Sequence, residues 1–376
     1  MSGWKVKHMP NNKNKDVRTK PSRPAVAGIG LTALDVIWEQ ESRQYQVAAG
    51  GTCGNVLCIL AYFGWKSSVI SRLAWDVASG ALEEDLKKWG VETKSLHLKP
   101  NARTPVIIEK VKKDSSGVPF HTFSFNCPGC GGRLPQFQPV VSEAVPALTK
   151  KIAKTDVLFI DRVSRSAITL ARSASENGAV VFFEPSASSN PKQLAELLEL
   201  SHIVKYSHDR VKDTGELDWG ANTHLQIQTF GRGGLQFRTN LANKHRSAWR
   251  SVPAVPVSGG LRDAAGAGDW LSAVLINRLC RDGIRQLRRT KFDDLLAAIN
   301  FGQAVAAWNC SFLGPRGSMY ALSRSQFWSQ LNELQRGKAA AAVVEPSGPW
   351  ETVDLPQEVC SICFPKRGKI GGTFAA

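Results

Sequence analysis

The chain has 376 residues, 43% hydrophobic and 21% charged, which is the composition of an ordinary folded protein. No apolar run approaches the roughly 20 residues of a membrane-spanning helix, and the N-terminus lacks the apolar segment of a secretory signal. We therefore expect a cytoplasmic protein without a membrane partner. The formal net charge of +16 favours anionic partners, but aromatic residues do not interleave with the basic ones, so nucleic acid binding is not favoured.

Residues 1–24 predict a solvated, disordered tail. Seven lysines and arginines in this stretch face one acidic residue, Asp16, and its apolar residues show no periodicity. Part of the positive charge therefore belongs to this tail rather than to a folded domain.

Residues 25–335 predict one α/β domain. Short apolar strands alternate with helical segments, and this order is typical of a mostly parallel sheet with helices on its faces. We expect strands near 25–29, 34–38, 67–71, 157–161, 179–184, 202–206, 225–229 and 235–238. We expect helices near 55–63, 77–89, 267–282, 292–310 and 324–334.

Two further features interrupt or follow this alternation. Segments 104–111 and 121–126 alternate polar and apolar residues on either side of Asp114-Ser115-Ser116-Gly117, which predicts a hairpin. Beyond the last helix, residues 336–376 form a C-terminal extension that begins as a linker of small residues and carries Cys360 and Cys363.

The segment Gly266-Ala267-Gly268 directly precedes a strongly apolar helix. Small residues there allow backbone N–H groups to approach an anion such as a phosphate, and the helix dipole favours the same charge. Asp269 follows in the first turn. Taken alone, this carboxylate favours a structural role like that of a helix cap, so its interpretation depends on the rest of the chain.

Four segments together resemble the PfkB, or ribokinase-like, family of carbohydrate kinases. The stretch from Asp263 to Leu271 is similar to the family motif D-T-T-G-A-G-D-x-F, with alanine in place of both threonines and leucine in place of phenylalanine. The other three matches are Asp35 on the strand near 34–38, Gly50-Gly51 followed by Asn55, and Thr229-x-Gly231-x-x-Gly234. They occur in the family's order and span about residues 28–317.

The resemblance implies a ribokinase-like fold and an ATP-dependent kinase that phosphorylates a hydroxyl group of a sugar or nucleoside. It also implies a small β lid, formed by about 34–47 and 103–126, that closes over the substrate and excludes water. ATP and Mg²⁺ are the implied cofactors. The exposed edge of such a lid could pair across a homodimer.

The resemblance also implies a role for each matching residue. Asp269 would be the general base, and the N–H groups of Gly266, Ala267 and Gly268 would stabilise the transferring phosphoryl group. The substrate hydroxyls would be bound by Asp35 and Asn55, next to Gly50 and Gly51. The ATP site would be lined by Thr229, Gly231 and Gly234.

One stretch departs from the family pattern. PfkB kinases usually carry N-x-x-E before the nucleotide loop, which organises Mg²⁺ and phosphate, whereas this chain has Ser207 and Arg210 at those positions. Either Asp209 or Glu184 holds the metal, or metal handling is weakened. The alternative function is therefore a catalytically impaired ribokinase-like protein that binds a sugar or nucleotide as a regulator.

The cysteines fall into two groups. Four stand in apolar helical contexts and are expected to be buried, namely Cys53, Cys58, Cys280 and Cys310. The others form two C-x-x-C pairs, Cys127 with Cys130 and Cys360 with Cys363. Because a structural zinc needs four ligands, these pairs together predict a zinc site that ties the C-terminal extension to the base of the lid. A simple turn at the first pair and a free or redox-active second pair remain the alternative.

Other nucleotide-binding motifs are excluded. Gly28-x-Gly30-x-x-Ala33 fits the dinucleotide fingerprint, but residues 34–38 read as a strand where that fingerprint requires a helix. The chain has no G-x-x-x-x-G-K-[ST] loop and no protein-kinase motif set.

Overall fold

The computed structural model describes residues 23–39, 44–99, 101–127, 130–186, 190–211, 217–241 and 245–338. Most of the predicted N-terminal tail and nearly all of the C-terminal extension, including Cys360 and Cys363, lie outside these ranges. Among the described helices, none is long and apolar enough to span a membrane.

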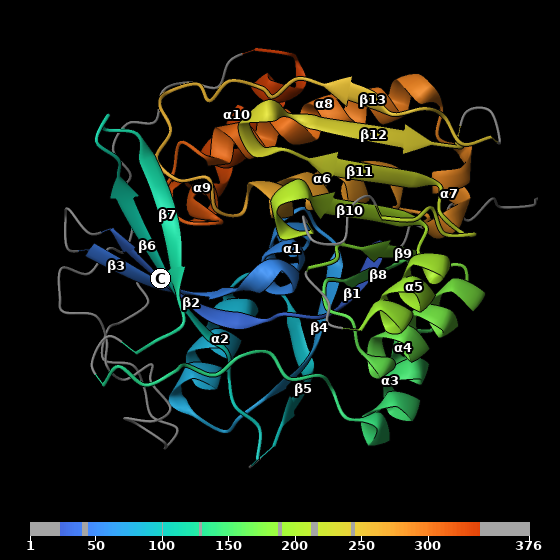
Figure 1. Cartoon of the computed structure of the whole chain (residues 1–376), viewed down its shortest axis with the longest axis horizontal. Helices are drawn as coiled ribbons and strands as arrows, with labels where there is room; N and C mark the ends of the chain where they lie inside the picture. The colour runs from blue at the N-terminus through green and yellow to red at the C-terminus, as the bar shows by residue number, and fades with distance from the viewer. Residues whose placement is uncertain are drawn as a thin grey trace, which may run out of the picture.

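A nine-stranded sheet in the order β13-β12-β11-β10-β9-β8-β1-β4-β5 forms the centre of the molecule (Figure 1). Its strands are β1 (Ala25–Ile29), β4 (Lys66–Leu73), β5 (Glu92–Leu98), β8 (Val157–Ile160), β9 (Val180–Phe183), β10 (Ile203–Ser207), β11 (Leu225–Thr229), β12 (Leu235–Thr239) and β13 (Arg250–Val252). All neighbouring pairs from β5 to β11 are parallel, whereas β12 pairs antiparallel with both β11 and β13. The predicted mostly parallel α/β architecture is therefore confirmed.

Helices cover both faces of this sheet. The longer ones are α1 (Gly51–Tyr62), α2 (Val77–Lys88), α3 (Val145–Ile152), α4 (Arg165–Glu176), α5 (Pro191–Leu200), α6 (Ala267–Leu279), α7 (Gly283–Arg289), α8 (Phe292–Asn309) and α10 (Arg324–Gln335), with the short α9 at Gly317–Ala321. Alternate strand residues face opposite sides, so Phe159 packs in one apolar cluster with α1, α6 and α8, while Leu158 packs in another with α3, α4 and α5. Both clusters are fully buried, which explains the near-continuous apolar strands.

A separate four-stranded sheet in the order β3-β2-β6-β7 projects from one side of the molecule (Figure 1). Its strands are β2 (Ala33–Glu39), β3 (Gln44–Gly50), β6 (Val106–Lys113) and β7 (Pro119–Ser124). The predicted hairpin joins β6 to β7, and Asp114 closes its turn by accepting hydrogen bonds from the N–H groups of Ser116 and Val118. On the face that carries Asp35 and Ile37, Glu109 lies opposite Ile37.

Two expectations need correction. The helix expected to run to residue 282 ends at Leu279, and α7 begins at Gly283, whose φ of 55° favours glycine and whose Cβ position lies 2.8 Å from the carbonyl oxygen of Gly178. Sequence patterns also missed strands β3, β5 and β13. Strand β5 is partly exposed and carries several polar residues, so it lacks the apolar run that identifies a buried strand.

Candidate active site

Asp269 lies in the first turn of α6 and is buried. Its Oδ2 accepts a hydrogen bond of 2.8 Å from the side-chain amide of Asn55, which comes from the first half of α1. Burial and the negative charge of Glu184 raise the pKa of Asp269 to about 7, against the opposing effects of Arg210, Asn55 and Lys205. A carboxyl with this pKa can accept a proton near neutral pH.

The turn before α6 is shaped by Gly266, which has a φ of 73°. A Cβ at this position would lie 2.4 Å from the carbonyl oxygen of Pro315, so only glycine fits. Among the described residues, no hydrogen bond partner contacts the N–H groups of Gly268 or Asp269, whereas the N–H group of Ala267 makes a long hydrogen bond of 3.4 Å to Ala264. The turn therefore presents backbone donors beside the Asp269 carboxylate.

Lys205 and Glu184 lie beneath this turn. The Lys205 ammonium is 2.6 Å from Glu184 Oε1, and the hydroxyl of Ser272 on α6 donates to Glu184 Oε2 at 2.6 Å. The Cβ position of Gly268 is 3.4 Å from Lys205 Nζ. A buried cation thus lies next to the backbone donors of this turn, held by a carboxylate with both oxygens engaged.

Asp35 on β2 is buried and accepts a hydrogen bond of 3.3 Å from the N–H group of Gly51. Its Oδ1 has no hydrogen bond partner among the described residues. Burial raises the pKa of Asp35 to about 7, although the Gly51 N–H group and the charge of Arg316 oppose that rise. A Cβ on Gly50 would lie 1.8 Å from Asp35 Oδ2, so this glycine makes room for the carboxylate.

A buried ion pair that sequence patterns did not predict holds the strand before Gly50. Arg316 Nη2 is 2.9 Å from Asp85 Oδ2, and the same carboxylate oxygen accepts a hydrogen bond of 2.9 Å from the N–H group of Ala49. Arg316 also donates to the carbonyl oxygen of Ala49, and its Nε donates to Asn55 Oδ1 at 3.0 Å. Both backbone groups of Ala49 and the amide of Asn55 are therefore fixed by one pair of side chains, which we call the Asp85–Arg316 clamp.

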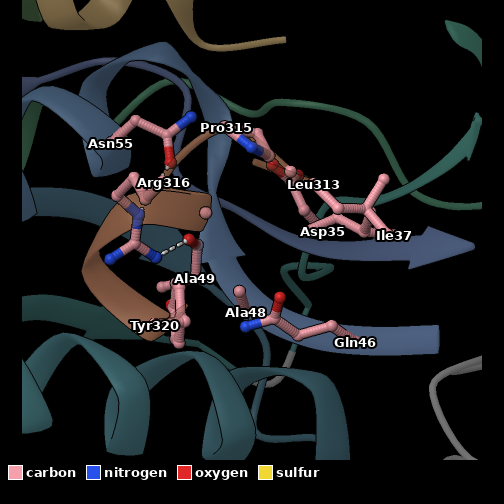
Figure 2. Close-up of a pocket in the computed structure, with 12 residues that line it drawn as sticks. Asp35, Ile37, Gln46, Ala48, Ala49, Asn55, Leu313, Pro315, Arg316 and Tyr320 are labelled. Atoms are coloured by element: carbon pink, nitrogen blue, oxygen red, sulfur yellow. Dashed lines mark hydrogen bonds between the residues drawn. The ribbon is translucent and has the colours of Figure 1, made fainter. Parts of the chain in front are cut away.

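A small cavity lies between these residues. Figure 2 shows Asp35, Asn55 and Arg316 around it, together with Gln46 from β3 and Leu313 from the loop after α8. Its volume is about 10 Å³, which is the space for about one water molecule. A larger cavity of about 520 Å³ lies at the C-terminal end of α6, opposite Asp269, and none of the motif residues lines it. A sugar-sized ligand at Asp35 would therefore require the small cavity to open.

The segment expected to bind a nucleotide follows β11. Thr229 is the last residue of β11 and lies opposite Ser207 at the end of β10. Gly231 and Gly234 have φ values of 55° and 85°, and a Cβ on Gly234 would lie 2.3 Å from the carbonyl oxygen of Val252. The tight turn that results leaves Phe230 partly exposed beside His208, with ring centroids 5.3 Å apart.

Comparison with known proteins assigns the family. Residues 24–213 match the family model described as pfkB family carbohydrate kinase. The chain belongs to the PfkB family. An Arabidopsis thaliana relative named "Probable fructokinase-5" is 26% identical over 314 residues, which cover 75% of this chain and 91% of the relative.

Solved structures show the same fold. Ribokinase from Giardia lamblia superposes with a TM-score of 0.62 at 14% identity, covering 83% of this chain and 99% of that one. Fructokinase with bound ATP from Xylella fastidiosa superposes with a TM-score of 0.60 at 18% identity, covering 84% and 98% of the two chains. The predicted ribokinase-like fold is confirmed.

In this PfkB protein, the residues at the two motif positions do not suit a magnesium site of the usual N-x-x-E kind. Ser207 and Arg210 occupy the two motif positions around a short helical turn, His208–Arg210, and Glu184 already engages Lys205 and Ser272. Burial raises the pKa of Asp269 and of Asp161, and the positive charge of Arg210 offsets part of that rise. This chain thus has a cationic side chain at the position where the family motif has glutamate.

Asp161 is a further buried carboxylate that the family motifs did not indicate. It follows β8, accepts a hydrogen bond of 2.8 Å from the N–H group of Leu31, and pairs with Arg162 at 2.9 Å. A Cβ on Gly30 would lie 1.6 Å from Asp161 Oδ1, which explains the glycine after β1. The break between the first two strands was visible in the sequence, but the side chain that fills it was not.

The cysteine predictions divide between described and undescribed residues. Cys53, Cys58, Cys280 and Cys310 are buried, as expected. Cys127 is buried and Cys130 is exposed, and hydrogen bonds join the N–H group of Cys127 to Gly132 and its carbonyl oxygen to Gly131. Because Cys360 and Cys363 lie outside the described residues, the zinc site stays a prediction.

Proposed function

We propose that this protein transfers the γ-phosphate of ATP to a hydroxyl group of a sugar or nucleoside, with Asp269 as the general base. The observation that carries this proposal is the position of a buried carboxyl, with a pKa of about 7, directly beside the open backbone donors of the turn before α6. A base with a pKa near the working pH is well matched to removing a hydroxyl proton in the transition state.

The residues around Asp269 support the same reaction. The N–H groups of Gly266 and Gly268 would stabilise the charge of the transferring phosphoryl group, assisted by the dipole of α6. Lys205 adds positive charge below the turn. The Ala267 N–H group, predicted to share this role, would first have to leave its long hydrogen bond to Ala264.

Substrate and nucleotide would approach from two sides. Asp35 Oδ1 and the cavity beside Asn55 would receive substrate hydroxyls, with Gly50 and Gly51 allowing close approach to the backbone. Thr229, Gly231 and Gly234 would line the ATP site at the carboxyl edge of the large sheet. The four-stranded sheet would act as a lid, and magnesium would arrive bound to the phosphates of ATP rather than held by protein carboxylates.

The test is turnover of ATP over a panel of sugars and nucleosides. Asp269→Asn keeps the size of the side chain and removes the base, so we expect kcat to fall by at least about 100-fold, the lower range for general base catalysis. Asp293→Asn, an exposed change at the start of α8, is the matched control. Turnover that Asp269→Asn leaves intact would exclude Asp269 as the base.

A second function is favoured by two observations. The cavity beside Asp35 holds only about one water molecule, and Arg210 replaces the expected acidic residue. Both fit a catalytically impaired protein that binds a sugar or nucleotide as a regulator. Ligand binding by calorimetry without turnover of any acceptor in the panel would select this function over the kinase.

A further inference from the structure

Three side chains distant in sequence meet where the four-stranded sheet touches the loop before α6. Glu109 comes from β6, His121 from β7, and Asp263 from the start of the motif that ends at Asp269. One potential ligand atom from each of the three residues lies within 4.8 Å of the other two. His121 Nδ1 is 3.0 Å from Asp263 Oδ1.

The two carboxyl groups are almost completely buried. Glu109 and Asp263 are each 1% exposed. Asp263 accepts hydrogen bonds of 2.9 Å from the N–H groups of Ala265 and Gly314. By contrast, no donor among the described residues reaches either carboxylate oxygen of Glu109, and its carboxyl group lies within hydrogen-bond reach of the Asp263 carboxyl group.

Such an arrangement needs a positive charge between the carboxylates. A buried carboxylate without a partner costs several kcal/mol, and a second carboxylate beside it adds repulsion. Burial and the neighbouring Asp263 raise the pKa of Glu109, and the negative charges of Asp35 and Asp269 raise it further. Either a proton or a metal cation can relieve this repulsion, and the imidazole of His121 favours the metal because it completes a set of three ligand atoms.

We propose that Glu109, His121 and Asp263 bind one divalent transition-metal ion. Two carboxylates neutralise a double positive charge, and one nitrogen with two oxygens suits Mn²⁺, Fe²⁺, Co²⁺ or Zn²⁺. The 3.0 Å between His121 Nδ1 and Asp263 Oδ1 is also the spacing of two neighbouring ligands that are each about 2.1 Å from an ion.

The ion would connect two parts of the fold. Glu109 and His121 belong to the four-stranded sheet, whereas Asp263 is fixed to the loop after α8 through Gly314. Binding would therefore hold β6 and β7 against the loop that leads to Gly266. Because the three ligands come from both sides of this contact, the site exists only when the sheet and the loop are together.

The test is titration of metal-depleted full-length protein with Co²⁺, followed by visible absorption. Co²⁺ bound to nitrogen and oxygen gives weak bands, whereas thiolates add intense charge-transfer bands, so this site is distinguishable from the cysteine pairs. We expect one Co²⁺ of the nitrogen–oxygen type per chain. Glu109→Gln and His121→Asn should each weaken its binding by more than about tenfold, the smallest loss seen when even an outer partner of a metal site is removed.

Matched controls are Glu143→Gln and His245→Asn, both on exposed residues, which should bind Co²⁺ like the wild type. His121 is partly exposed, so its variant tests the site even if the change at Glu109 perturbs folding. Co²⁺ binding of this type that survives both substitutions overturns the proposal. So does its absence from the wild type, or an infrared band of a protonated carboxyl that Glu109→Gln removes and that persists with Co²⁺ present.

Discussion

The carboxyl groups around the turn before α6 are unusual because burial raises their pKa values despite the cations near them. Asp35 and Asp269 both have pKa values raised to about 7, and burial is the largest cause for each. Asp161 has a pKa raised to about 6 for the same reason. Protonation of these groups near neutral pH should therefore affect both activity and stability.

Arg210 should lower the pH at which the enzyme becomes active. Its charge lowers the pKa of Asp269, so Arg210→Gln should raise that pKa and move the acidic limb of the kcat/KM profile to higher pH. The profile is measured with saturating ATP for wild type, Arg210→Gln and the exposed control Arg172→Gln. Superimposable acidic limbs for all three proteins would show that Arg210 does not act on the base.

Asp35 should make the protein less stable as pH rises. Its folded pKa of about 7 lies above the ordinary aspartate value of 3.8, so its contribution to the free energy of unfolding is complete below about pH 4 and lost as pH rises through 7. Asp35→Asn cannot ionise and should remove this loss, which amounts to a few kcal/mol because one pKa unit corresponds to about 1.4 kcal/mol.

Urea unfolding of both proteins across this pH range measures the effect. In Asp293→Asn, the free energy of unfolding should depend on pH as it does in the wild type. An Asp35→Asn curve parallel to the wild-type curve would mean that Asp35 is ionised in the folded protein without penalty.

For individual residues, the sequence predicted side chains that belong to recognised motifs. It missed the side chains that hold those motif residues in position. Asn55 and Asp269 were both selected, and the structure joins them by a hydrogen bond. Asp85 and Arg316 were not, because they are 231 residues apart and belong to no motif that the resemblance supplied. A buried arginine becomes recognisable only once the fold shows what surrounds it.

Among the helices and strands, the junction of β3 and α1 contains glycines that differ in the space around them. Gly50→Ala would place a Cβ 1.8 Å from Asp35 Oδ2, so we expect a loss of about 1–3 kcal/mol of stability and weaker substrate binding. Gly54→Ala, one helical turn later, meets nothing closer than 3.5 Å and should stabilise α1 by about 0.5–1 kcal/mol.

Urea unfolding should show that Gly50→Ala lowers the free energy of unfolding and that Gly54→Ala raises it. Equal stability changes would show that the Asp35 carboxylate can move away from β3 at little cost.

The strands also show what hydrophobic periodicity can predict. Buried strands such as β8 and β9 are continuous apolar runs and were located within one or two residues. Strand β3 was missed because its residues mix polar and apolar types, and its pairing with β2 is a contact that only the folded chain reveals.

At the scale of the whole molecule, the predicted zinc site would attach the C-terminal extension to the base of the lid. If the two C-x-x-C pairs hold zinc, native mass spectrometry should show a zinc ion that Cys130→Ser removes. Cys280→Ala, a change at a buried cysteine within the core, should retain the ion. A wild-type mass equal to that of the metal-free chain would contradict the zinc site.

The Asp85–Arg316 clamp also has a consequence for the order in which the protein matures. The hydrogen bond from Arg316 to Ala49 spans 267 residues, so the strand before Gly50 cannot be fixed until the ribosome has released almost the entire domain. A nascent chain that already contains Asp35, Gly50 and Asn55 would still lack the arginine that positions them. Competence to bind a ligand would therefore arise late in synthesis and abruptly, rather than growing as successive strands join the sheet.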